Sequence, residues 1–352
     1  MGGILSILIA ILILIFLISK RDKHLFWDKQ PVMRTYGDKI GIIGSNTSFN
    51  IKIVNPDMSL KLINTNVDEV YSLLNNNFSE YFNINSEFFN YIYNITGSIN
   101  ISLYDKDKVI GFIHSHPIVI DYNNSKIPFM YVDYLCIDKM YRSKDAAAIM
   151  IASLINKVGD KSMPFLFKRD SVRLPYLNMF KSRYYYDDIR KVGEKPIDTI
   201  RLLDKSDNLD KYLEYINKLF NRFKFKKLYS REDFIDIFID KHIYKCYIIS
   251  NNNGFETIVI GKANNFKWFG ETYKTFDIDY ILGELKNSGE IGDILKYRLK
   301  LDGYNFITAP HIANNIIFIN ENKLKKANTY YYYTYNYNLP MIEQHDCCFN
   351  IN

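Results

Sequence analysis

The sequence predicts an α/β fold. The first observation is a strand, Phe129 to Ile137, that leads through a polar turn, Asp138 to Lys144, into a helix with apolar residues at helical spacing. The second is that both halves of the chain repeat the order of helices, hairpin, helix and strand. The third is composition: 352 residues with 47% hydrophobic and 24% charged side chains can bury a sizeable core, which excludes a disordered chain.

The net charge of +6 suits an anionic ligand or a membrane surface, and no dense Lys/Arg patch indicates nucleic-acid binding. Four cysteines are present without a metal-binding spacing, and two of them are adjacent, so they cannot easily pair with each other. We therefore expect a reducing compartment. The cysteines are Cys136, Cys246, Cys347 and Cys348.

The N-terminus begins with an apolar run, Ile4 to Ile18. As a helix the run spans roughly 22 Å, and Met1 to Ser19 spans roughly 28 Å, which can cross a bilayer. Lys20, Arg21 and Lys23 follow it, so we expect a single-pass membrane anchor at residues 1–20 with the rest of the chain facing the cytosol. A cleaved signal peptide is the alternative, but signal peptides begin with basic residues and end in a small-residue cleavage site, and neither feature is evident here. Met1 to Ser6 also fits a myristoylation pattern, which leaves lipidation of Gly2 open.

The first half continues with a predicted helix over 67–77, in which Val70, Leu73 and Leu74 face inward. Residues 98–104 and 109–113 flank a charged turn and predict a β-hairpin. The central helix follows the strand and turn described above, and residues 163–167 predict a short strand. The inward-facing apolar residues of the central helix are Ala147, Ile151, Leu154, Ile155 and Val158.

The second half begins after Gly193 to Pro196, the best candidate for a domain boundary. Ser230 is typical of a helix N-cap. The tyrosine-rich stretch Thr329 to Asn338 predicts a buried strand rather than a stacking platform for bases. The remaining predicted elements are helices over 209–223, 234–240 and 290–300, a hairpin of 244–250 with 255–261, and a strand over 304–308.

His114 and His116 lie on one face of the predicted second hairpin strand and could form a metal pair. The fragment is similar to the start of a zinc isopeptidase motif. That motif needs Ser and Asp at positions where this chain has Asn124 and Ile127, so the spacing argues against a zinc site.

The turn before the central helix predicts an anion site. Unpaired N–H groups at the helix start lie beside Arg142 and Lys144, which suits the pyrophosphate of a nucleotide or of coenzyme A. The alternative is an ordinary strand–turn–helix with solvated charges.

Three stretches resemble segments of the glycylpeptide N-myristoyltransferases. Residues 132–148, VDYLCIDKMYRSKDAAA, resemble the block I-N-F-L-C-V-x-K-x-x-R-S-K-R-x-A-P of that family without a gap. Residues 24–32, HLFWDKQPV, resemble its signature F-W-x-T-Q-P-V, with Lys29 in place of Thr. The stretch 329–338 is similar to its strand Y-Y-L-Y-N-W.

The resemblance implies a doubled acyl-CoA N-acyltransferase (GNAT-like) fold with two pseudo-twofold-related halves: 21–192 for acyl-CoA and 193–352 for peptide. It implies transfer of a myristoyl group from myristoyl-CoA, as co-substrate and without a metal, to the N-terminal glycine amine of proteins, by a monomer. The coenzyme A contacts that it implies are Leu25, Phe26, Trp27, Tyr134, Leu135, Cys136, Ile137, Arg142, Ser143, Lys144, Asp145, Ala146 and Ala147.

In the mechanism implied by the resemblance, the backbone N–H groups of Tyr134 and Leu135 hold the oxyanion, and a bulge would free them from the ladder. The α-carboxylate of Asn352 is the base. Asp133, where the family has Asn, could hold the ammonium or act as a second base.

Other departures concern the acceptor side. Lys168 and Arg169 replace part of a Thr-Ala-Gly segment, Tyr186 replaces a His, and Asp145 replaces an Arg near the phosphates. The acidic loop is reduced to residues 78–81. A weakened homologue that binds acyl-CoA or a lipidated peptide, an acyltransferase for another amine, and a metallo-isopeptidase therefore remain alternatives.

Overall fold

A computed structural model describes most of the chain from Trp27 to Phe349. The predicted anchor at residues 1–20, the coenzyme contacts Leu25 and Phe26, and Asn352 lie outside the described residues. Across the part that is described, no helix is long and apolar enough to cross a membrane. The described residues are Trp27, 30–37, 39–44, 49, 58–61, 66–77, 82–142, 145–160, 162–197, 199–241, 243–250, 256–268, 270–283 and 288–349.

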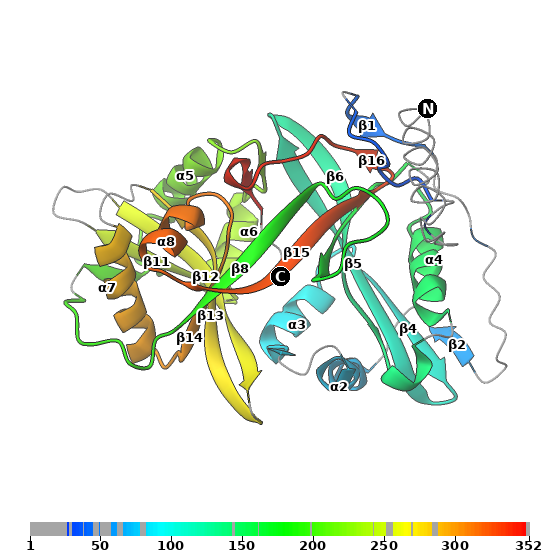
Figure 1. The fold of residues 1–352 in the computed structure, drawn as a ribbon, viewed down its shortest axis with the longest axis horizontal. Coiled ribbons are helices and arrows are strands. Elements are labelled where there is room, and N and C mark those ends of the chain that lie inside the picture. Colours follow the sequence, from blue (N-terminus) through cyan, green and yellow to red (C-terminus); the bar gives the residue numbers. More distant parts are fainter. Residues whose placement is uncertain are drawn as a thin grey trace, which may run out of the picture.

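One mixed sheet runs through both halves of the molecule (Figure 1). Its strand order is β17-β10-β5-β6-β7-β15-β8-β14-β13-β12-β11-β9, with β2, β3 and β4 off this path. The bounds of the strands at the two edges and off the path are β2 Met58–Lys61, β3 Phe82–Asn83, β9 Ile200–Leu202, β10 Phe225–Lys226 and β17 Cys347–Cys348. A separate two-stranded sheet pairs β1, Gly41–Ile42, with β16, Tyr337–Asn338.

The two halves repeat one arrangement. In the first, β4 (Ile99–Asp105), β5 (Lys108–Tyr122) and β6 (Ser125–Ile137) form an antiparallel meander, and β7 (Phe165–Asp170) returns parallel to β6 after helix α4 (Ala146–Val158). In the second, the corresponding elements are β11 (Lys245–Ser250), β12 (Glu256–Trp268), β13 (Glu271–Leu282), α7 (Ser288–Leu301) and β14 (Phe306–Pro310).

The halves exchange a strand at the centre of the sheet. Strand β8, Phe180–Asp188, follows β7 in the chain but pairs with β14 of the second half. Strand β15, Lys325–Tyr335, follows β14 but pairs with β7 of the first half, and β8 and β15 also pair with each other. This reciprocal exchange supports the expected approximate twofold, and it means that a division near residue 193 does not cut the sheet into separate parts.

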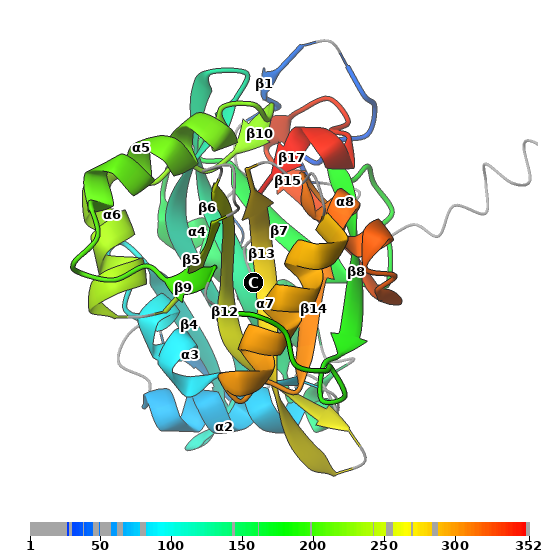
Figure 2. The ribbon, with the colours of Figure 1, turned by 90° about the vertical axis from the view of Figure 1, so that its left-hand side faces the viewer.

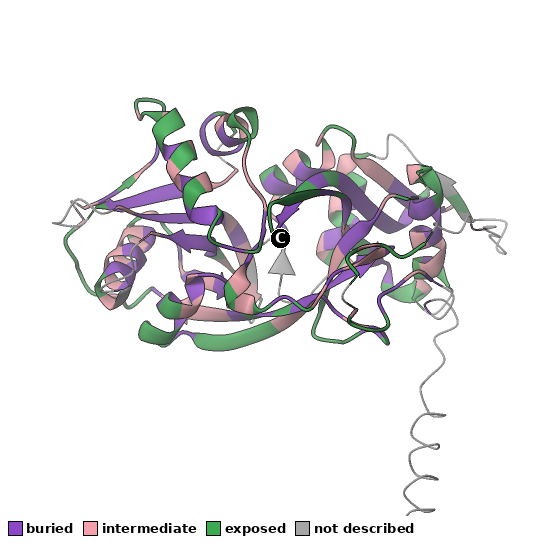
Figure 3. Ribbon diagram, turned by 90° about the horizontal axis from the view of Figure 1, so that it is seen from above, coloured by how far each residue is buried: buried purple, intermediate pink, exposed green. Residues whose placement is uncertain are grey.

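Helices cover the sheet on both faces (Figures 1 and 2). Helix α4 packs against β4, β5 and β6, whereas α2 (Val67–Asn77) and α3 (Ser86–Tyr93) belong to a separate core cluster that includes Phe112 and Tyr134. In the second half α7 packs beside α8 (Asn315–Glu321), and α5 (Leu209–Phe220) and α6 (Arg231–Ile235) close another cluster. Buried residues follow the strands through both halves (Figure 3).

Most expected elements are confirmed. Helix α2 has the predicted bounds, with Val70, Leu73 and Leu74 buried. Ser230 caps α6 by accepting a hydrogen bond from the Asp233 N–H, but the helix after it is α-helical only to Ile235. The tyrosine strand β15 is buried at its C-terminal end, as expected for a strand in the middle of a sheet.

The expected end of β5 at Ile113 is wrong, because the strand continues through Pro117 to Tyr122. Proline lacks the N–H that a central strand needs on both sides. Strand β4 pairs with β5 only as far as Ser115 of β5. Strand β10 pairs with the same edge of β5 only at Asp121 and Tyr122. Pro117 therefore lies between two partners, where its missing N–H costs no ladder bond.

Candidate functional site

The site begins where strands β6 and β7 separate. These parallel strands pair over three residues each, from Met130 with Phe165 to Val132 with Phe167. Beyond this point both strands continue, β6 to Ile137 and β7 to Asp170, without further pairing between them. Separated parallel strands leave backbone groups and side chains facing the gap, and here the gap holds a cavity.

The cavity has a volume of about 500 Å³, within the range of small-molecule sites. One wall is apolar and comes from α4, β5, β7 and β15. The opposite end is polar and comes from the separated ends of β6 and β7. The lining residues are Trp27, Ile113, Val132, Asp133, Tyr134, Leu135, Ala147, Ala148, Ile151, Leu154, Ile155, Phe165, Phe167, Lys168, Arg169, Asp170, Leu174 and Tyr335.

The predicted inward stripe of α4 therefore faces this cavity rather than a closed core. Leu154 and Ile155 are buried, but Ala147 is exposed and Ile151 is only half-buried. Four of the five predicted stripe residues line the cavity, while Val158 packs at the edge of the core cluster. An apolar wall that stays partly open is suited to a long hydrocarbon chain.

A β-bulge lies at the polar end, as expected. The register between β5 and β6 shifts from His114 opposite Asp133 to Phe112 opposite Cys136, so Tyr134 and Leu135 together oppose Ile113. Tyr134 has a positive φ of 54°, which a non-glycine residue adopts only when its surroundings hold it there. The bulge thus turns two successive peptide groups out of the regular ladder beside the cavity.

Asp133 lies next to these peptide groups and already interacts with one of them. Its Oδ1 accepts a hydrogen bond of 2.8 Å from the Tyr134 N–H. Burial raises the pKa of this carboxyl, while the charge of Lys168 opposes that shift. Because one proposed oxyanion donor is engaged by Asp133, an incoming oxyanion must compete with a carboxylate for it.

Lys168 and Arg169 both line the cavity, so the basic residues that replace the Thr-Ala-Gly segment do face the site. Burial lowers the pKa of Lys168, and Asp133 partly offsets this effect. The ammonium also lies 5.5 Å from the centre of the Tyr330 ring. A positive charge here disfavours a second cation unless an acidic group accompanies it.

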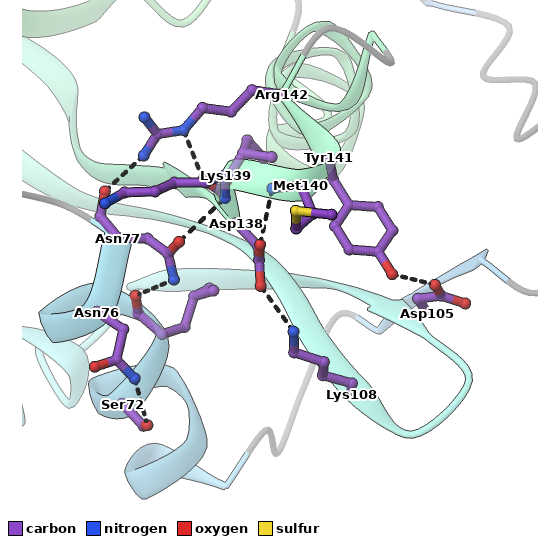
Figure 4. A network of polar contacts seen from close by, with 12 residues as sticks. Ser72, Asn76, Asn77, Asp105, Lys108, Asp138, Lys139, Met140, Tyr141 and Arg142 are labelled. Carbon is purple, nitrogen blue, oxygen red and sulfur yellow. Dashed lines mark hydrogen bonds and ion pairs between the residues drawn. The ribbon is translucent and has the colours of Figure 1, made fainter.

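The turn between β6 and α4 is tied to helix α2 (Figure 4). Arg142 donates to the carbonyl oxygens of Ile137 at 3.1 Å and Asn77 at 2.6 Å, and the Lys139 N–H donates to the Asn77 Oδ1. A cation at the C-terminus of a helix is favourable, so Arg142 also stabilises the end of α2. At least part of its guanidinium is therefore used within the fold.

Asp145 occupies the N-cap position of α4. It has a positive φ of 54°, and its carboxylate makes no capping hydrogen bond. Its side chain is exposed. The predicted anion-binding residues Ser143 and Lys144 lie outside the described part of the chain.

Trp27 is the described residue of the predicted N-terminal coenzyme segment, and it lies in the cavity wall. Its ring stacks on Phe167 at 6.2 Å and meets Tyr176 at 5.2 Å. Strand β15 holds the segment that follows: Tyr335 donates to the Gln30 Oε1 at 3.0 Å, and the Asn336 N–H donates to the Pro31 carbonyl.

Five predicted site residues thus meet in one cavity, and five do not line it. Trp27, Asp133, Tyr134, Leu135 and Ala147 line the cavity. The other five described residues surround it, with Cys136 facing the α2–α3 cluster and Ile137 facing the α4 cluster. Those outside the lining are Cys136, Ile137, Arg142, Asp145 and Ala146.

Several cavity residues were missed in the sequence. Tyr335 and Leu174 come from segments far from the central motif, and no local pattern connects them with it. Ile113 and Phe165 are ordinary apolar strand residues by composition. Both residues lie in segments that the sequence predicted as strands, and only the separation of β6 and β7 turns their buried face into a binding surface.

Phe349, the last residue that the structure describes, packs next to β6. Phe349 is fully buried, and its ring lies 6.4 Å from that of Tyr131 and 5.3 Å from that of Phe225. Cys347 and Cys348 form β17, which pairs with β10. Asn352, the predicted base, lies beyond the described residues, but the last described residue is packed in the core.

Residues 54–163 match the family model of the N-terminal domain of myristoyl-CoA:protein N-myristoyltransferase. No curated protein matches the chain in sequence. A crystal structure of Saccharomyces cerevisiae N-myristoyltransferase with bound myristoyl-CoA is similar at a TM-score of 0.76 and 18% identity, covering 91% of this chain and 94% of that one. Another, with bound myristoyl-CoA and inhibitors, has a TM-score of 0.75 and 18% identity, covering 91% of each chain.

The chain has the N-myristoyltransferase fold. The family match spans less than a third of the 352 residues, and it contains β4, β5, β6 and α4, which supply much of the cavity. Together the family match and the fold indicate an acyltransferase. Among the described residues no group of three His, Cys, Asp or Glu side chains could hold a metal ion.

Proposed function

We propose that this protein transfers a myristoyl group from myristoyl-CoA to the N-terminal glycine amine of a protein. The observation that carries the proposal is the cavity between β6, β7 and α4, with an apolar wall at one end and a bulged strand at the other. Similar solved structures hold myristoyl-CoA, which supports the same co-substrate here. The acyl chain would lie along Ile151, Leu154 and Ile155, with the thioester at the bulge.

The thioester carbonyl needs hydrogen-bond donors for the charge that develops during attack. We assign this role to the N–H groups of Tyr134 and Leu135. The Asp133 carboxylate, which accepts the Tyr134 N–H, would have to release it as the oxyanion forms. When the Asp133 carboxylate turns away from the Tyr134 N–H, it can form a charge-assisted hydrogen bond with the glycine ammonium. That bond offsets the loss of the one from Tyr134.

The amine must lose a proton before it attacks the carbonyl carbon. An α-amine has a pKa of about 7.7–8.0 and an α-carboxyl about 3.3–3.7, so transfer between them in water is uphill by about 5–6 kcal/mol. Burial raises the pKa of a carboxyl and narrows this gap. We propose the Asn352 carboxylate as acceptor, supported by the burial of Phe349 three residues earlier, with Asp133 as a second acceptor.

Bond changes in the proposed step balance without another reactant. The amine nitrogen bonds to the thioester carbon, the carbon–sulfur bond breaks, and coenzyme A leaves as a thiolate. The glycine ammonium gives one proton to the base before the attack, and the nitrogen loses a second proton after it has bonded to the carbon. One of these protons neutralises the thiolate, and the other passes to solvent. No metal takes part in this scheme.

The test uses the full chain in detergent micelles, labelled myristoyl-CoA, and peptides that start with glycine. We expect a labelled amide with a free-glycine peptide and none with the same peptide acetylated at its N-terminus. Deleting Ile351 and Asn352 should lower kcat by on the order of 10²–10⁴-fold if the carboxylate is the base. If the shortened chain formed product at an unchanged rate, the Asn352 carboxylate would not be the base, although the proposed reaction would still stand.

A second candidate is a protein that binds acyl-CoA or a lipidated peptide without turnover. It is favoured by the two basic side chains in the cavity, Lys168 and Arg169, and by the occupied Tyr134 N–H. Tight binding of myristoyl-CoA with no amide formed from any glycine peptide would support this candidate and exclude the first. An amide formed only with amines other than a peptide N-terminus would instead indicate a different acceptor.

We also propose, from the sequence, that residues 1–20 anchor the protein in a membrane with its catalytic part in the cytosol. The apolar run Ile4 to Ile18 supports this. Carbonate extraction of membranes from cells that express the full chain tests it: the protein should stay in the pellet, and a chain starting at Arg21 should move to the supernatant.

A further inference from the structure

Strand β1 and the residues beside it expose a group of apolar side chains. Tyr36, Ile40, Ile42 and Ile43, here called the β1 patch, are each between 42% and 54% exposed. Gly41 is open as well, since a Cβ added there would meet no atom within 4 Å beyond its chain neighbours. The other large apolar residues that are exposed in the described ranges each stand alone in the chain. Scattered apolar residues are normal on a surface, whereas a group of them indicates a partner.

The body of the protein holds this segment in place. In the two-stranded sheet of β1 and β16, Gly41 is opposite Asn338. The Asn338 side-chain N–H donates to the Lys39 carbonyl at 2.8 Å, and the Ile43 N–H donates to the Asn336 carbonyl at 3.3 Å. Among the described residues β1 has no second partner strand. The backbone is therefore tied to the body on one side, and the apolar side chains remain on its outer surface.

The segment that follows Trp27 lies beside the β1 patch. The Asn336 N–H donates to the Pro31 carbonyl at 2.7 Å, and the Asn336 carbonyl accepts from Ile43, so one residue joins this segment to the patch. The Trp27 carbonyl accepts from the Arg34 guanidinium at 2.9 Å, which holds the start of the segment close by. Figure 1 shows β1 and β16 at the end of the molecule away from α7.

The proposed membrane anchor at residues 1–20 is connected to Trp27 by a short stretch of chain. Only residues 21–26 lie between them. The seven steps from residue 20 to Trp27 reach at most about 25 Å when fully extended. Because Trp27 is fixed in the cavity wall, an anchor at residues 1–20 keeps the bilayer surface within about this distance of it. Only the end of the molecule that carries Trp27 and the β1 patch can face the bilayer closely.

The charge of this part of the chain suits an anionic lipid surface. Residues 20–44 contain six basic and three acidic residues. Of the basic residues, Arg34 and Lys39 are exposed next to the β1 patch. Basic residues close to a membrane are attracted by anionic headgroups. Apolar side chains with an aromatic ring and flanking basic residues are typical of surfaces that lie in the membrane interface.

We propose that the β1 patch docks on the bilayer that holds the N-terminal anchor. Ile40, Ile42 and Ile43 enter the boundary between headgroups and acyl chains, and Tyr36 supplies the aromatic side chain that is enriched there. The anchor and the patch are two points of attachment, which fix the orientation of the body and hold the cavity lined by Trp27 beside the bilayer. The proposal uses the anchor proposed above, but it needs neither an acceptor nor acyl transfer.

The test labels one position of the full chain with a fluorescent dye. The four native cysteines are buried, so Ile42→Cys adds one accessible thiol, which is labelled with the fluorophore NBD. The protein is reconstituted into vesicles of phosphatidylcholine and phosphatidylserine, with and without a phosphatidylcholine that carries a nitroxide near the top of its acyl chain. We expect the nitroxide to quench at least about half of the emission, because interfacial apolar side chains enter about 5–10 Å into this boundary.

Leu301→Cys is the matched control, because Leu301 is 53% exposed and ends α7 in the other half of the molecule. Its label should keep nearly all of its emission in the same vesicles. A second variant adds Ile40→Asp and Ile43→Asp to Ile42→Cys. Both positions are exposed, so the fold tolerates the carboxylates, and most of the quenching at position 42 should disappear because charged side chains do not enter the apolar boundary.

Equal quenching at positions 42 and 301, or none at position 42, would overturn the proposal. Emission at position 42 that falls with rising protein-to-lipid ratio, without the nitroxide lipid, would show that a second copy covers the patch and would overturn it as well. Flotation of the same vesicles tests the anchor separately: protein that floats without quenching has the anchor but does not dock, and protein that does not float has neither. Acyl transfer is not measured in this test, so a failure of the proposed function would leave its result unchanged.

Discussion

The two halves of the molecule share one arrangement of strands, yet the face under the crossover helix borders a cavity in the first half and a cluster of large buried side chains in the second. In each half the crossover strand pairs with its parallel neighbour over three residues, β7 with β6 and β14 with β13. In each half the preceding hairpin has a register shift near that point. The backbone plan is thus repeated, and the difference lies in the side chains and in one extra helix.

In the second half large side chains fill the face under α7. Leu295 and Leu299 of α7 are fully buried against Phe276 and Ile278 of β13. Helix α8 adds Phe318 to the same cluster. In the first half α4 begins with three alanines, and Ala147 and Ala148 line the cavity instead of filling it. The comparison indicates that small residues at the start of α4 keep the ligand space open.

The other face of the second half also carries buried polar contacts. Asp277 accepts from Thr308 at 2.7 Å and from Asn264 at 2.9 Å, and Lys262 pairs with Asp279 at 3.3 Å with both side chains buried. Gly261 at the register shift has no room for a Cβ, which would lie 2.4 Å from the Asp277 carbonyl oxygen. This half is therefore built as a rigid support, whereas the first half carries the site.

The largest effect should come from breaking the buried pair of the second half. Asp279→Ala leaves the Lys262 ammonium buried without its carboxylate, which costs about 3–5 kcal/mol. Urea unfolding of the full chain should show the loss. Lys195→Ala, which removes an exposed ion pair with Asp293, is the control and should cost less than about 1 kcal/mol. Equal losses for both would contradict the view of this half as the rigid one.

A matched pair of truncations tests the solid core against the cavity wall. Leu295→Ala removes a fully buried side chain and should destabilise by about 2–5 kcal/mol. Ile151→Ala removes a half-buried side chain that borders the cavity, and we expect about 1 kcal/mol, because part of its surface is already open. Thermal unfolding without ligand provides the measurement. A larger loss at Ile151 than at Leu295 would reverse the comparison.

Filling the cavity should separate binding from stability. Ala147→Phe places a ring at an exposed position that lines the cavity, so we expect myristoyl-CoA to bind at least about 30-fold more weakly, or about 2 kcal/mol, while Tm stays within a few degrees. Calorimetric titration with myristoyl-CoA gives the affinity. Ala152→Phe, on the buried face of the same helix, is the opposite control: it should lower Tm. If Ala147→Phe bound myristoyl-CoA with unchanged affinity, the cavity could not be the site of the acyl chain.

Local patterns in the sequence predicted what depends on nearby residues. The periodicity of 67–77 predicted α2 with its buried side chains, and the alternation around the charged turn predicted the β4–β5 hairpin. The bulge at Tyr134 and Leu135 was implied by the resemblance to a family and is present. In these cases the information lies within a few residues of the element.

The sequence could not predict features that depend on distant segments. Apolar residues at helical spacing indicate a covered face, but Ile151 faces a cavity because β6 and β7 separate there. The exchange of β8 and β15 joins residues 165–170 to residues 330–335, and no local pattern encodes that pairing. The same holds for the hydrogen bonds that join Asn100 to His114 at 2.7 Å and His114 to His116 at 3.0 Å, two histidines that the sequence offered as a possible metal pair.

The smallest expected effect concerns the turn between β6 and α4, which is tied to helix α2. The hydrogen bond from Lys108 and that from the Met140 N–H lower the pKa of Asp138. A carboxyl with a lowered pKa in the folded state adds stability above its unfolded pKa, about 3.9, and loses it as the pH falls through the lower folded value. Asp138→Ala should therefore cost about 1 kcal/mol at pH 7, and the difference from the wild type should shrink below about pH 4. Unfolding in urea at pH 7 and at pH 3 measures both. The control is Glu214→Ala, which removes an exposed carboxyl that forms no hydrogen bond or ion pair with the described residues. If the difference persisted at pH 3, Asp138 would act through packing rather than charge.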